Sequence, residues 1–390
     1  MRNIILEDDV TKHTGLLPLT FTRPVAELTV GIDTIHAKWE RLLDGRYSWR
    51  TTDYLSELFP EAEAGGDNIV IDSSIIPDRR LAEAIDSLQP GCELVRYDGR
   101  RIALRYSAEP TAGESKAYSG AIREIGRPYD IFELCGEEIV NDLDYRKAIS
   151  MPQTVSDTCT VIGSRDLVFI EPGATVEGVT LNTTKGPIYI GEGAEVMEGS
   201  CLRGPVAIGE CATVNMLTRI YGATSIGAHC KVGGEINNAV MFPYSNKAHD
   251  GFLGNAVIGS WCNLGAGCVA SNLKNDYTEI KLWDYTTRRF ARTGLQFCGL
   301  IMGDHSKAGI NTMFNTATVV GVGVNIHGTG FPRNFVASFS EGSAVAGFSD
   351  VPLSKFFAIA ERVMARRDIK LSDAERRLFT RLHEITETYK

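Results

Sequence analysis

Five polar residues in the second half of the chain combine side chains suited to proton transfer with side chains suited to anion binding. They are Arg219, Glu235, His249, Asn263 and Asn272, at intervals of 16, 14, 14 and 9 residues. Histidine accepts a proton near neutral pH, so His249 is a candidate general base. The Arg219 guanidinium offers a fork of donors for a phosphate, and the Asn272 amide can hold an amine or a developing oxyanion. These residue types suit proton transfer beside a bound anion.

A six-residue repeat predicts the scaffold that positions these side chains. Aliphatic residues occupy every sixth position at Ile190, Val196, Leu202, Ile208, Val214, Ile220, Ile226 and Val232. The phase resumes at Phe252, Ile258, Leu264 and Ala270, and again at Met302, Ala308, Phe314, Val320 and Ile326. An amphipathic helix needs apolar spacings of three and four, and an isolated strand needs a spacing of two. A sustained phase of six therefore predicts a parallel β-helix from about residue 152 to 328.

Two stretches interrupt this repeat. The first, residues 236–251, contains His249, and the second, residues 271–295, is polar and contains Asn272. Loops that leave a rigid scaffold often carry binding and catalytic residues. We therefore expect the site at these interruptions, although the coil can also be interpreted as a scaffold or an oligomerisation module alone.

Composition excludes several classes of protein. The formal net charge is −9, and no basic stripe suited to nucleic acid is present. No apolar run reaches the roughly 18 residues that a transmembrane helix needs, and the acidic stretch 7–9 argues against a signal peptide. Nine cysteines without a C-x-x-C pair fit small buried residues of a reducing compartment. We expect a cytoplasmic protein that neither binds nucleic acid nor enters a membrane.

Glycine usage predicts three domains. Residues 1–150 contain 11 glycines, residues 151–350 contain 28 and residues 351–390 contain none. In the first zone, strand-like runs at 3–6 and 68–72 alternate with helical patterns at 34–43 and 80–88, which favours an α/β layer with a parallel sheet.

The third zone reads as two amphipathic helices, 352–367 and 372–388. Ser372 and Glu375 have the spacing of a capping box at the start of the second. We expect these helices to pack against the coil or a partner subunit.

The first zone resembles sugar-phosphate nucleotidyltransferases. The run Leu-Pro-Leu-Thr-Phe-Thr-Arg-Pro at 17–24 is similar to the segment after their phosphate loop. Where that family has G-x-G-T-R, this chain has Lys-His-Thr-Gly at 12–15. The resemblance implies a reduced, Rossmann-like domain in which Lys12, Thr14 and Arg23 are candidate nucleotide-binding residues. Asp72, after a strand-like run, is a candidate Mg²⁺ ligand or a turn-forming residue.

The coil resembles the acetyltransferase domain of the bifunctional N-acetylglucosamine-1-phosphate uridyltransferase/glucosamine-1-phosphate acetyltransferase family. The four intervals above and the local motifs at 247–249, 263–267 and 271–272 carry this resemblance. It implies a left-handed β-helix, a homotrimer and acetyl-CoA as acyl donor. It also implies His249 and Asn272 as catalytic residues. The acceptor-binding candidates are Arg219, Asn263, Lys247, Phe252 and Lys281, and the coenzyme A candidates are Ala266, Gly309 and Ile310.

Departures from the family pattern indicate a different acceptor. Asn237 and Asn238 stand where the family has a phosphate-binding Lys, and Phe252 and Leu273 replace two Tyr residues. Two functions remain open. One is a coenzyme A-dependent acyltransferase that acts on an amino sugar phosphate or a nucleotide sugar. The other is a non-catalytic sugar-nucleotide-binding or scaffold protein that retains both folds.

Each candidate also has a simpler interpretation that stays open. His249 can be a solvated loop residue, Asn263 a corner residue of the coil, and Arg219 an ordinary surface arginine.

Overall fold

The chain folds into two compact units in a computed structural model that describes residues 2–107 and 109–390. The first unit comprises Met1–Leu28 and Asp33–Arg127, and the second comprises Thr29–Ile32 and Pro128–Lys390. The compact units thus divide at residue 128, inside the predicted first domain of residues 1–150, and the C-terminal helices belong to the same unit as the coil. No helix in the described part of the chain is long and apolar enough to cross a membrane.

The first unit is built on a six-stranded mixed sheet of order β2-β1-β3-β6-β5-β7. The strands are β1 (Asn3–Glu7), β2 (Arg46–Arg50), β3 (Asn68–Asp72), β5 (Cys92–Val95), β6 (Arg101–Tyr106) and β7 (Glu114–Ala117). β1 pairs with β2 and β3 in parallel, whereas β6 runs antiparallel to both β3 and β5. β5 and β7 also pair in parallel, so the predicted parallel sheet is interrupted only where the antiparallel β6 lies between β3 and β5. A small antiparallel pair joins β4 (Ile75–Ile76) to β8 (Arg123–Glu124).

Three α-helices belong to this unit: α1 (Val10–Gly15), α2 (Ile35–Glu40) and α3 (Arg79–Asp86). The helices predicted at 34–43 and 80–88 are present, and α1 covers residues 12–15, where no helix was predicted. Asp9 starts it, because its carboxylate accepts the Lys12 backbone N–H at 2.9 Å. Short 3₁₀ helices of this unit span Leu19–Phe21, Val25–Glu27 and Asp53–Leu55. Two more, Arg165–Leu167 and Glu387–Tyr389, belong to the second unit.

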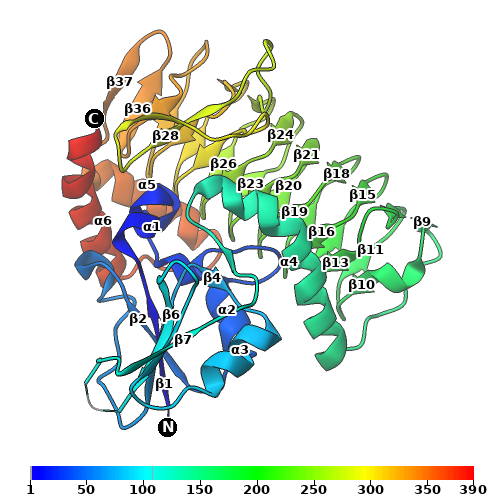
Figure 1. Cartoon of the computed structure of the whole chain (residues 1–390). Coiled ribbons are helices and arrows are strands. Elements are labelled where there is room, and N and C mark those ends of the chain that lie inside the picture. Colours follow the sequence, from blue (N-terminus) through cyan, green and yellow to red (C-terminus); the bar gives the residue numbers. More distant parts are fainter. Residues whose placement is uncertain (1, 108) are drawn as a thin grey trace. The chain divides into compact units, whose positions relative to one another are not determined.

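The second unit contains a left-handed parallel β-helix with three faces, whose strands stack in Figure 1 from β10 to β36. The first face has β10 (Val168–Ile170), β13 (Ile188–Ile190), β16 (Val206–Ile208), β19 (Thr224–Ile226), β22 (Val240–Met241), β25 (Val257–Ile258), β30 (Ile301–Met302), β33 (Val319–Val320) and β35 (Phe335–Val336). The second has β11 (Thr175–Val176), β14 (Glu195–Val196), β17 (Thr213–Val214), β20 (Lys231–Val232), β23 (Asn246–Lys247), β26 (Asn263–Leu264), β31 (Lys307–Ala308), β34 (Asn325–Ile326), β36 (Ser340–Ser343) and the antiparallel β37 (Gly347–Asp350). The third has β9 (Thr160–Ile162), β12 (Thr180–Asn182), β15 (Cys201–Arg203), β18 (Arg219–Tyr221), β21 (Glu235–Asn237), β24 (Phe252–Gly254), β27 (Val269–Ala270) and β32 (Met313–Phe314).

The six-residue phase explains this architecture. Ile190, Val196 and Leu202 point inward from the first, second and third face in turn, and each is at most 1% exposed. Each later coil places its aliphatic residues in register above them, so one continuous core fills the prism. Burying a side chain of this size contributes about 1.5–3 kcal/mol. The repeat therefore stabilises the whole coil.

The first predicted interruption does not leave the scaffold. β21, β22, β23 and β24 continue the coil through residues 235–254. In register with Val232, Lys247 takes the inward position, and Leu253 rather than Phe252 continues the inward row of Ile236. His249 consequently lies at a turn between two strands of the coil, not on an excursion. The polar character of the inward Lys247 hid this continuity in the sequence.

The second interruption does leave the scaffold, as predicted. Between β27 and β30 the chain forms an antiparallel hairpin of β28 (Lys281–Asp284) and β29 (Arg289–Arg292).

Three further helices cover the coil. α4 (Pro128–Ile149) packs along β16, β19, β22 and β25 of the first face. α5 (Leu353–Ala365) and α6 (Asp373–Thr386) follow the last coil, with the predicted capping box of Ser372 and Glu375 formed. Phe356 of α5 and Phe379 of α6 place their rings 5.8 and 5.3 Å from that of His305, so both helices pack on the coil.

Candidate functional site

His249 lies on one long edge of the prism, formed by the turns that connect the second face to the third. This His249 edge comprises residues 215–218, 233–234, 248–251, 265–268 and 309–312. Direct hydrogen bonds tie the turns together across coils. The Asn215 amide donates to the carbonyl of Ala248 at 2.7 Å, and the N–H of Gly267 donates to the carbonyl of Asp250 at 3.0 Å. The backbone that carries His249 is therefore held from both sides.

The His249 side chain itself is exposed, and it makes no hydrogen bond to another residue in the described part of the chain. Its backbone carbonyl accepts a hydrogen bond from the buried Lys247 ammonium at 2.7 Å, which also donates to the carbonyl of Gly233 at 3.0 Å. A solvent-facing imidazole on a fixed backbone can take a proton from a bound nucleophile.

Arg219, Glu235 and Phe252 form a row at the start of three adjacent third-face strands, next to the His249 edge. The Arg219 guanidinium lies 3.8 Å from the Glu235 carboxylate and is largely exposed. Tyr221, which the sequence did not single out, donates its hydroxyl to that carboxylate at 2.6 Å. Its spacing of two from Arg219, on the same side of a strand, was the available signal. This hydrogen bond and partial burial raise the pKa of Tyr221.

The three coenzyme A candidates lie on the same edge as His249. Ala266 is in the turn 265–268, and Gly309 and Ile310 are in the turn 309–312 directly above it. Ile310 is 71% exposed, so an apolar side chain faces solvent here. A Cβ on Gly265 would lie 2.8 Å from the Gly309 backbone, which explains why glycine recurs at this stacked turn.

Two predicted site residues lie elsewhere in the coil. The turns that connect the third face to the first form a second edge of the prism, which we call the Asn272 edge. On this edge the Asn272 amide donates to the Asn255 side chain at 2.8 Å. Asn263 projects from the second face and lines a hollow of about 330 Å³ with Lys307 and Glu341. Asn272 therefore lies on a different edge of the prism from His249, whereas Asn263 pairs with Asn246, three residues before His249, in the neighbouring coil.

Lys281 and Lys247 also differ from the expected arrangement. Lys281 belongs to β28 of the excursion hairpin, where it is exposed. Lys247 is 1% exposed and donates only to backbone carbonyls, so its position fits a structural role under His249 rather than contact with a substrate. Burial lowers its pKa from 10.5 to about 8.

In the first unit, the nucleotide-binding candidate Lys12 contacts the candidate Mg²⁺ ligand Asp72. The Lys12 ammonium lies 2.7 Å from both the Asp72 carboxylate and the Glu124 carboxylate, and it donates to the Ser74 hydroxyl at 2.6 Å. Burial opposes ionisation of Glu124, but hydrogen bonds from Arg96 and Lys12 outweigh it and lower the pKa of Glu124. A Mg²⁺ ion could reach Asp72 only after the Lys12 ammonium had moved away.

The other two nucleotide-binding candidates, Thr14 and Arg23, lie in or next to short helices. Thr14 lies in α1, and Arg23 follows the 3₁₀ helix Leu19–Phe21. A short helix, capped by Asp9, therefore stands where the resemblance implies a phosphate loop.

Cysteine exposure differs in part from expectation. All nine thiols are free, and Cys230, Cys262 and Cys268 are buried in the coil, but Cys201 and Cys211 are exposed. The Cys211 sulfur, a Glu210 carboxylate oxygen and a His229 ring nitrogen all lie within 4.8 Å of one another. The 18-residue step of the coil brings His229 next to the other two, a grouping that the sequence analysis did not predict.

Comparison with known proteins supports the resemblance. Residues 4–149 match a family model described as sugar nucleotidyl transferase. The bifunctional protein GlmU of Synechococcus elongatus is 24% identical over 184 residues, which cover 45% of this chain and 36% of that protein. A bifunctional sugar-1-phosphate nucleotidylyltransferase/acetyltransferase of Sulfurisphaera tokodaii is 32% identical over 145 residues, covering 37% of this chain and 36% of that protein. The chain spans about a third of the length of these relatives.

A solved Arabidopsis UDP-N-acetylglucosamine acyltransferase covers 60% of this chain and 91% of its own, with 14% identity and a TM-score of 0.22. That likeness is too weak to inform function. The family match and the curated relatives confirm the resemblance to GlmU-like transferases.

Proposed function

We propose that this GlmU-like transferase is an acyl-CoA-dependent N-acyltransferase whose acceptor is an amino sugar phosphate or a nucleotide-linked amino sugar. The main support is the His249 edge, which carries an exposed imidazole on the same edge as the turns assigned to coenzyme A, with Arg219 two strands away on the adjoining third face. A base and an anion-binding guanidinium are parts that this reaction needs.

The reaction uses His249 as a general base. The acceptor amine attacks the thioester carbonyl, and His249 takes the proton that the nitrogen loses. The new C–N bond forms as the C–S bond breaks, and the coenzyme A thiolate leaves and is protonated. Arg219 holds the acceptor phosphate, which places the amine near the imidazole.

Asn272 and Asn263 join this site from neighbouring subunits in the proposed homotrimer. Asn272 is on a different edge of the prism from His249. Asn263 projects from the second face and lines a hollow that His249 does not line. Packing of three prisms around a threefold axis brings unlike edges together. A monomer mass by light scattering at micromolar concentration would contradict this arrangement.

The His249→Ala variant tests the assignment directly. An acceptor is first found by screening amino sugars, their 1-phosphates and nucleotide-linked forms with acetyl-CoA, using release of the coenzyme A thiol as the signal. We then expect His249→Ala to lower kcat by about 10²–10⁴-fold, the usual range for a lost general base. Folding stays intact, because the exposed ring adds little to the core.

The matched control is His229→Ala, the same chemical change at a turn between the first and second faces. Equal kcat values for the wild-type and His249→Ala proteins would overturn the base assignment. Loss of activity in the control alone would point to a different edge.

A second function remains for the first unit, namely nucleotide or sugar-phosphate binding with little or no nucleotidyl transfer. The Lys12 ammonium between Asp72 and Glu124 favours it, because these carboxylates are already neutralised without a metal. We expect slow, Mg²⁺-dependent turnover of UTP or dTTP with a sugar 1-phosphate, lost in Asp72→Asn. Turnover at ordinary enzyme rates would contradict this reading.

A further inference from the structure

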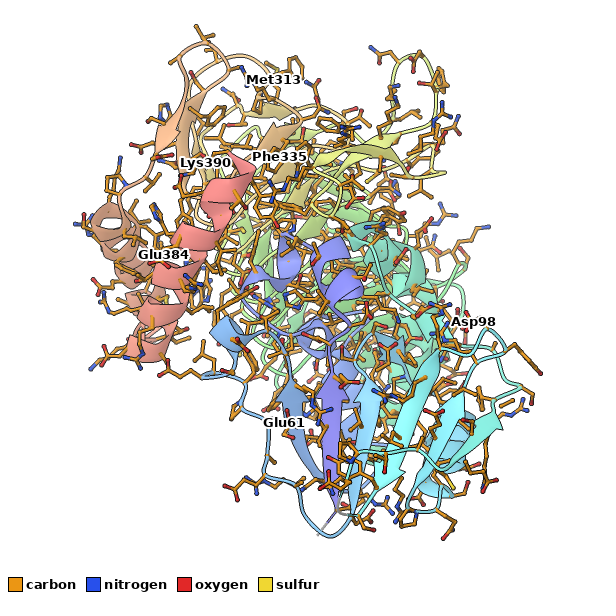
Figure 2. The ribbon with its side chains drawn as sticks, turned by 60° about the vertical axis from the view of Figure 1, so that its left-hand side comes forward. Glu61, Asp98, Met313, Phe335, Glu384 and Lys390 are labelled. Atoms are coloured by element: carbon orange, nitrogen blue, oxygen red, sulfur yellow. The ribbon has the colours of Figure 1, made fainter. Side chains whose placement is uncertain are left out.

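A large cavity lies at the C-terminal end of the coil, beside the Asn272 edge. Its volume is about 1220 Å³, which is enough for a ligand the size of a nucleotide. It is open to solvent, and the excursion hairpin of β28 and β29, the turn 315–317 and the segment 331–335 line it. Phe335, labelled in Figure 2, lies on β35 of the first face. None of the candidate residues except Lys281 lines this cavity.

Positive charge faces the cavity. Lys274, Lys281 and Arg333 line it, and the side chains of Lys281 and Arg333 form no hydrogen bond or ion pair with any residue in 2–107 or 109–390. Among the described lining residues Glu279 is the one acid, and its carboxylate is held by Arg292 at 2.9 Å. In a chain of net charge −9, unpaired cations around a hollow indicate an anionic ligand.

Aromatic rings form another part of the wall. Trp283 and Phe335 stack with centroids 4.1 Å apart and planes 13° apart, which makes a rigid floor. Phe290 meets the Trp283 ring edge-on at 5.4 Å. Phe290 and Phe331 are 43% and 52% exposed, so two apolar rings face solvent beside the cations. Exposed aromatic rings next to basic side chains suit a planar base that carries phosphates.

Polar groups in the wall can read the edge of such a base. The side chain of Asn315 forms no hydrogen bond with another described residue, and the indole N–H of Trp283 is buried without a partner in the described residues. The Asn334 amide N–H donates to the Thr316 carbonyl at 2.7 Å, so its orientation is fixed. Amide groups held in this way accept and donate to heterocycle edges.

We propose that this cavity binds the base and phosphates of a nucleotide. The aromatic rings contact the base, and Lys281 and Arg333 bind the phosphates. Ser271 and Leu273, which flank Asn272, also line the cavity, so the bound nucleotide reaches the edge that carries Asn272. The nucleotide can belong to the acceptor, as a nucleotide-linked sugar, or to coenzyme A. Only this choice between sources rests on the proposed acyltransferase function.

Binding to the full-length protein, measured by calorimetry, tests the proposal. The probes are UDP, dTDP, ADP, coenzyme A, adenosine 3′,5′-bisphosphate and inorganic pyrophosphate. We expect the Lys281→Gln/Arg333→Gln variant to bind its best nucleotide at least about tenfold more weakly, since two charge-assisted contacts are lost. Phe331→Ala should weaken nucleotide binding but not pyrophosphate binding.

Two controls isolate the cavity. Arg289→Gln removes an exposed charge from the same hairpin without lining the cavity, and it should bind like wild type. Lys12→Gln alters the first unit. Nucleotide binding that is lost in Lys12→Gln and kept in the double variant would overturn the proposal. Pyrophosphate binding as tight as that of every nucleotide would overturn it too, because a charged patch alone then explains the affinity.

The two sources give different patterns, and both support the cavity. Preference for UDP or dTDP assigns the acceptor, and preference for coenzyme A and adenosine 3′,5′-bisphosphate assigns the donor. Nucleotide binding at the cavity without any acyl transfer would contradict the proposed function alone. Acyl transfer with unchanged KM values in the double variant would contradict the cavity proposal alone.

Discussion

Lys247 shows how one residue serves both the core and the site. It occupies a position that is aliphatic in the neighbouring coils, where Val232 and Leu264 are inward. Its ammonium donates to the carbonyls of Gly233 and His249, and no carboxylate compensates its charge in the described hydrogen bonds. Burial therefore disfavours the charged form and lowers the pKa to about 8.

This predicts a pH-dependent contribution to stability. Between about pH 8 and 10.5, Lys247 is mostly neutral in the folded chain and protonated in the unfolded chain. The unfolded state then binds more protons, so the free energy of unfolding rises with pH by up to about 1.4 kcal/mol per pH unit from this group. Below pH 8 both states are protonated, and the contribution is lowest and constant.

The Lys247→Met variant removes this dependence. We expect the difference in unfolding free energy, wild type minus variant, to increase as pH rises from 8 to 10, measured by urea denaturation at each pH. Lys231→Met is the control, because the exposed Lys231 keeps its ammonium in solvent. A difference that does not change with pH would show that folding does not lower the pKa of Lys247.

At this scale sequence reasoning singled out His249 and Arg219 as candidates, whose roles stay predictions, but not the residues around them. Their side chain types and spacing carried chemical information. Lys247 was taken as a ligand because its inward direction depends on a 15-residue step between Val232 and Lys247, which breaks the six-residue phase. Tyr221 and Asn215 were missed because their contacts cross coils, and only the folded register brings them together.

At the scale of elements, the stacked turns of the His249 edge depend on close backbone approach. Gly251 has φ of +130°, and a Cβ there would lie 1.9 Å from the carbonyl oxygen of Cys268 in the next coil. Glycine is therefore required at this turn, two residues after His249.

The Gly251→Ala variant should consequently separate two turns of this edge. We expect a loss of about 1–3 kcal/mol in unfolding free energy, and lower acyl transfer because His249 shifts. The control is Gly347→Ala, where φ is +81° but no atom lies within 4 Å of the added Cβ. Equal losses in both variants would indicate backbone strain alone and not the packing of the edge.

The elements were predicted unevenly from the sequence. The β-helix follows from its aliphatic phase, and the C-terminal helices follow from their amphipathic pattern and capping box. The continuation of the coil through 236–251 was not predicted, because its inward residues are 16 and 17 positions apart in the third-face row of Ile220, Ile236 and Leu253. The antiparallel strands β5 and β6 were missed because polar and charged residues interrupt their apolar pattern.

At the scale of the whole molecule, the two units interrupt each other along the chain. Thr29–Ile32 belongs to the second unit although residues on both sides belong to the first. The buried Ser225 hydroxyl donates to the Gly31 carbonyl at 2.6 Å, and the Ile32 N–H donates to the buried Asp142 carboxylate at 2.8 Å. This four-residue segment is thus part of the structure that supports the coil. Glycine composition gave no sign of it.

Gly31→Ala should therefore destabilise the second unit. Gly31 has φ of +83°, and a Cβ there would lie 2.7 Å from both the Asp142 carboxylate and the Glu138 side chain. We expect the unfolding transition of the coil to lose about 1–3 kcal/mol, followed by calorimetry. Gly99→Ala is the control, with φ of +81° and open space around the added atom. An unchanged coil transition in Gly31→Ala would mean that the segment does not support the second unit.

The segment Thr29–Ile32 is also synthesised long before its contacts in the second unit. Ser225 emerges from the ribosome 194 residues after Gly31. At roughly 5–20 residues per second, Gly31 waits on the order of 10–40 s for this partner. The first unit is translated completely within that interval, so its polypeptide must fold around a loop that is not yet anchored. Translation speed between residues 128 and 225 therefore decides how long that loop stays open to chaperones and proteases.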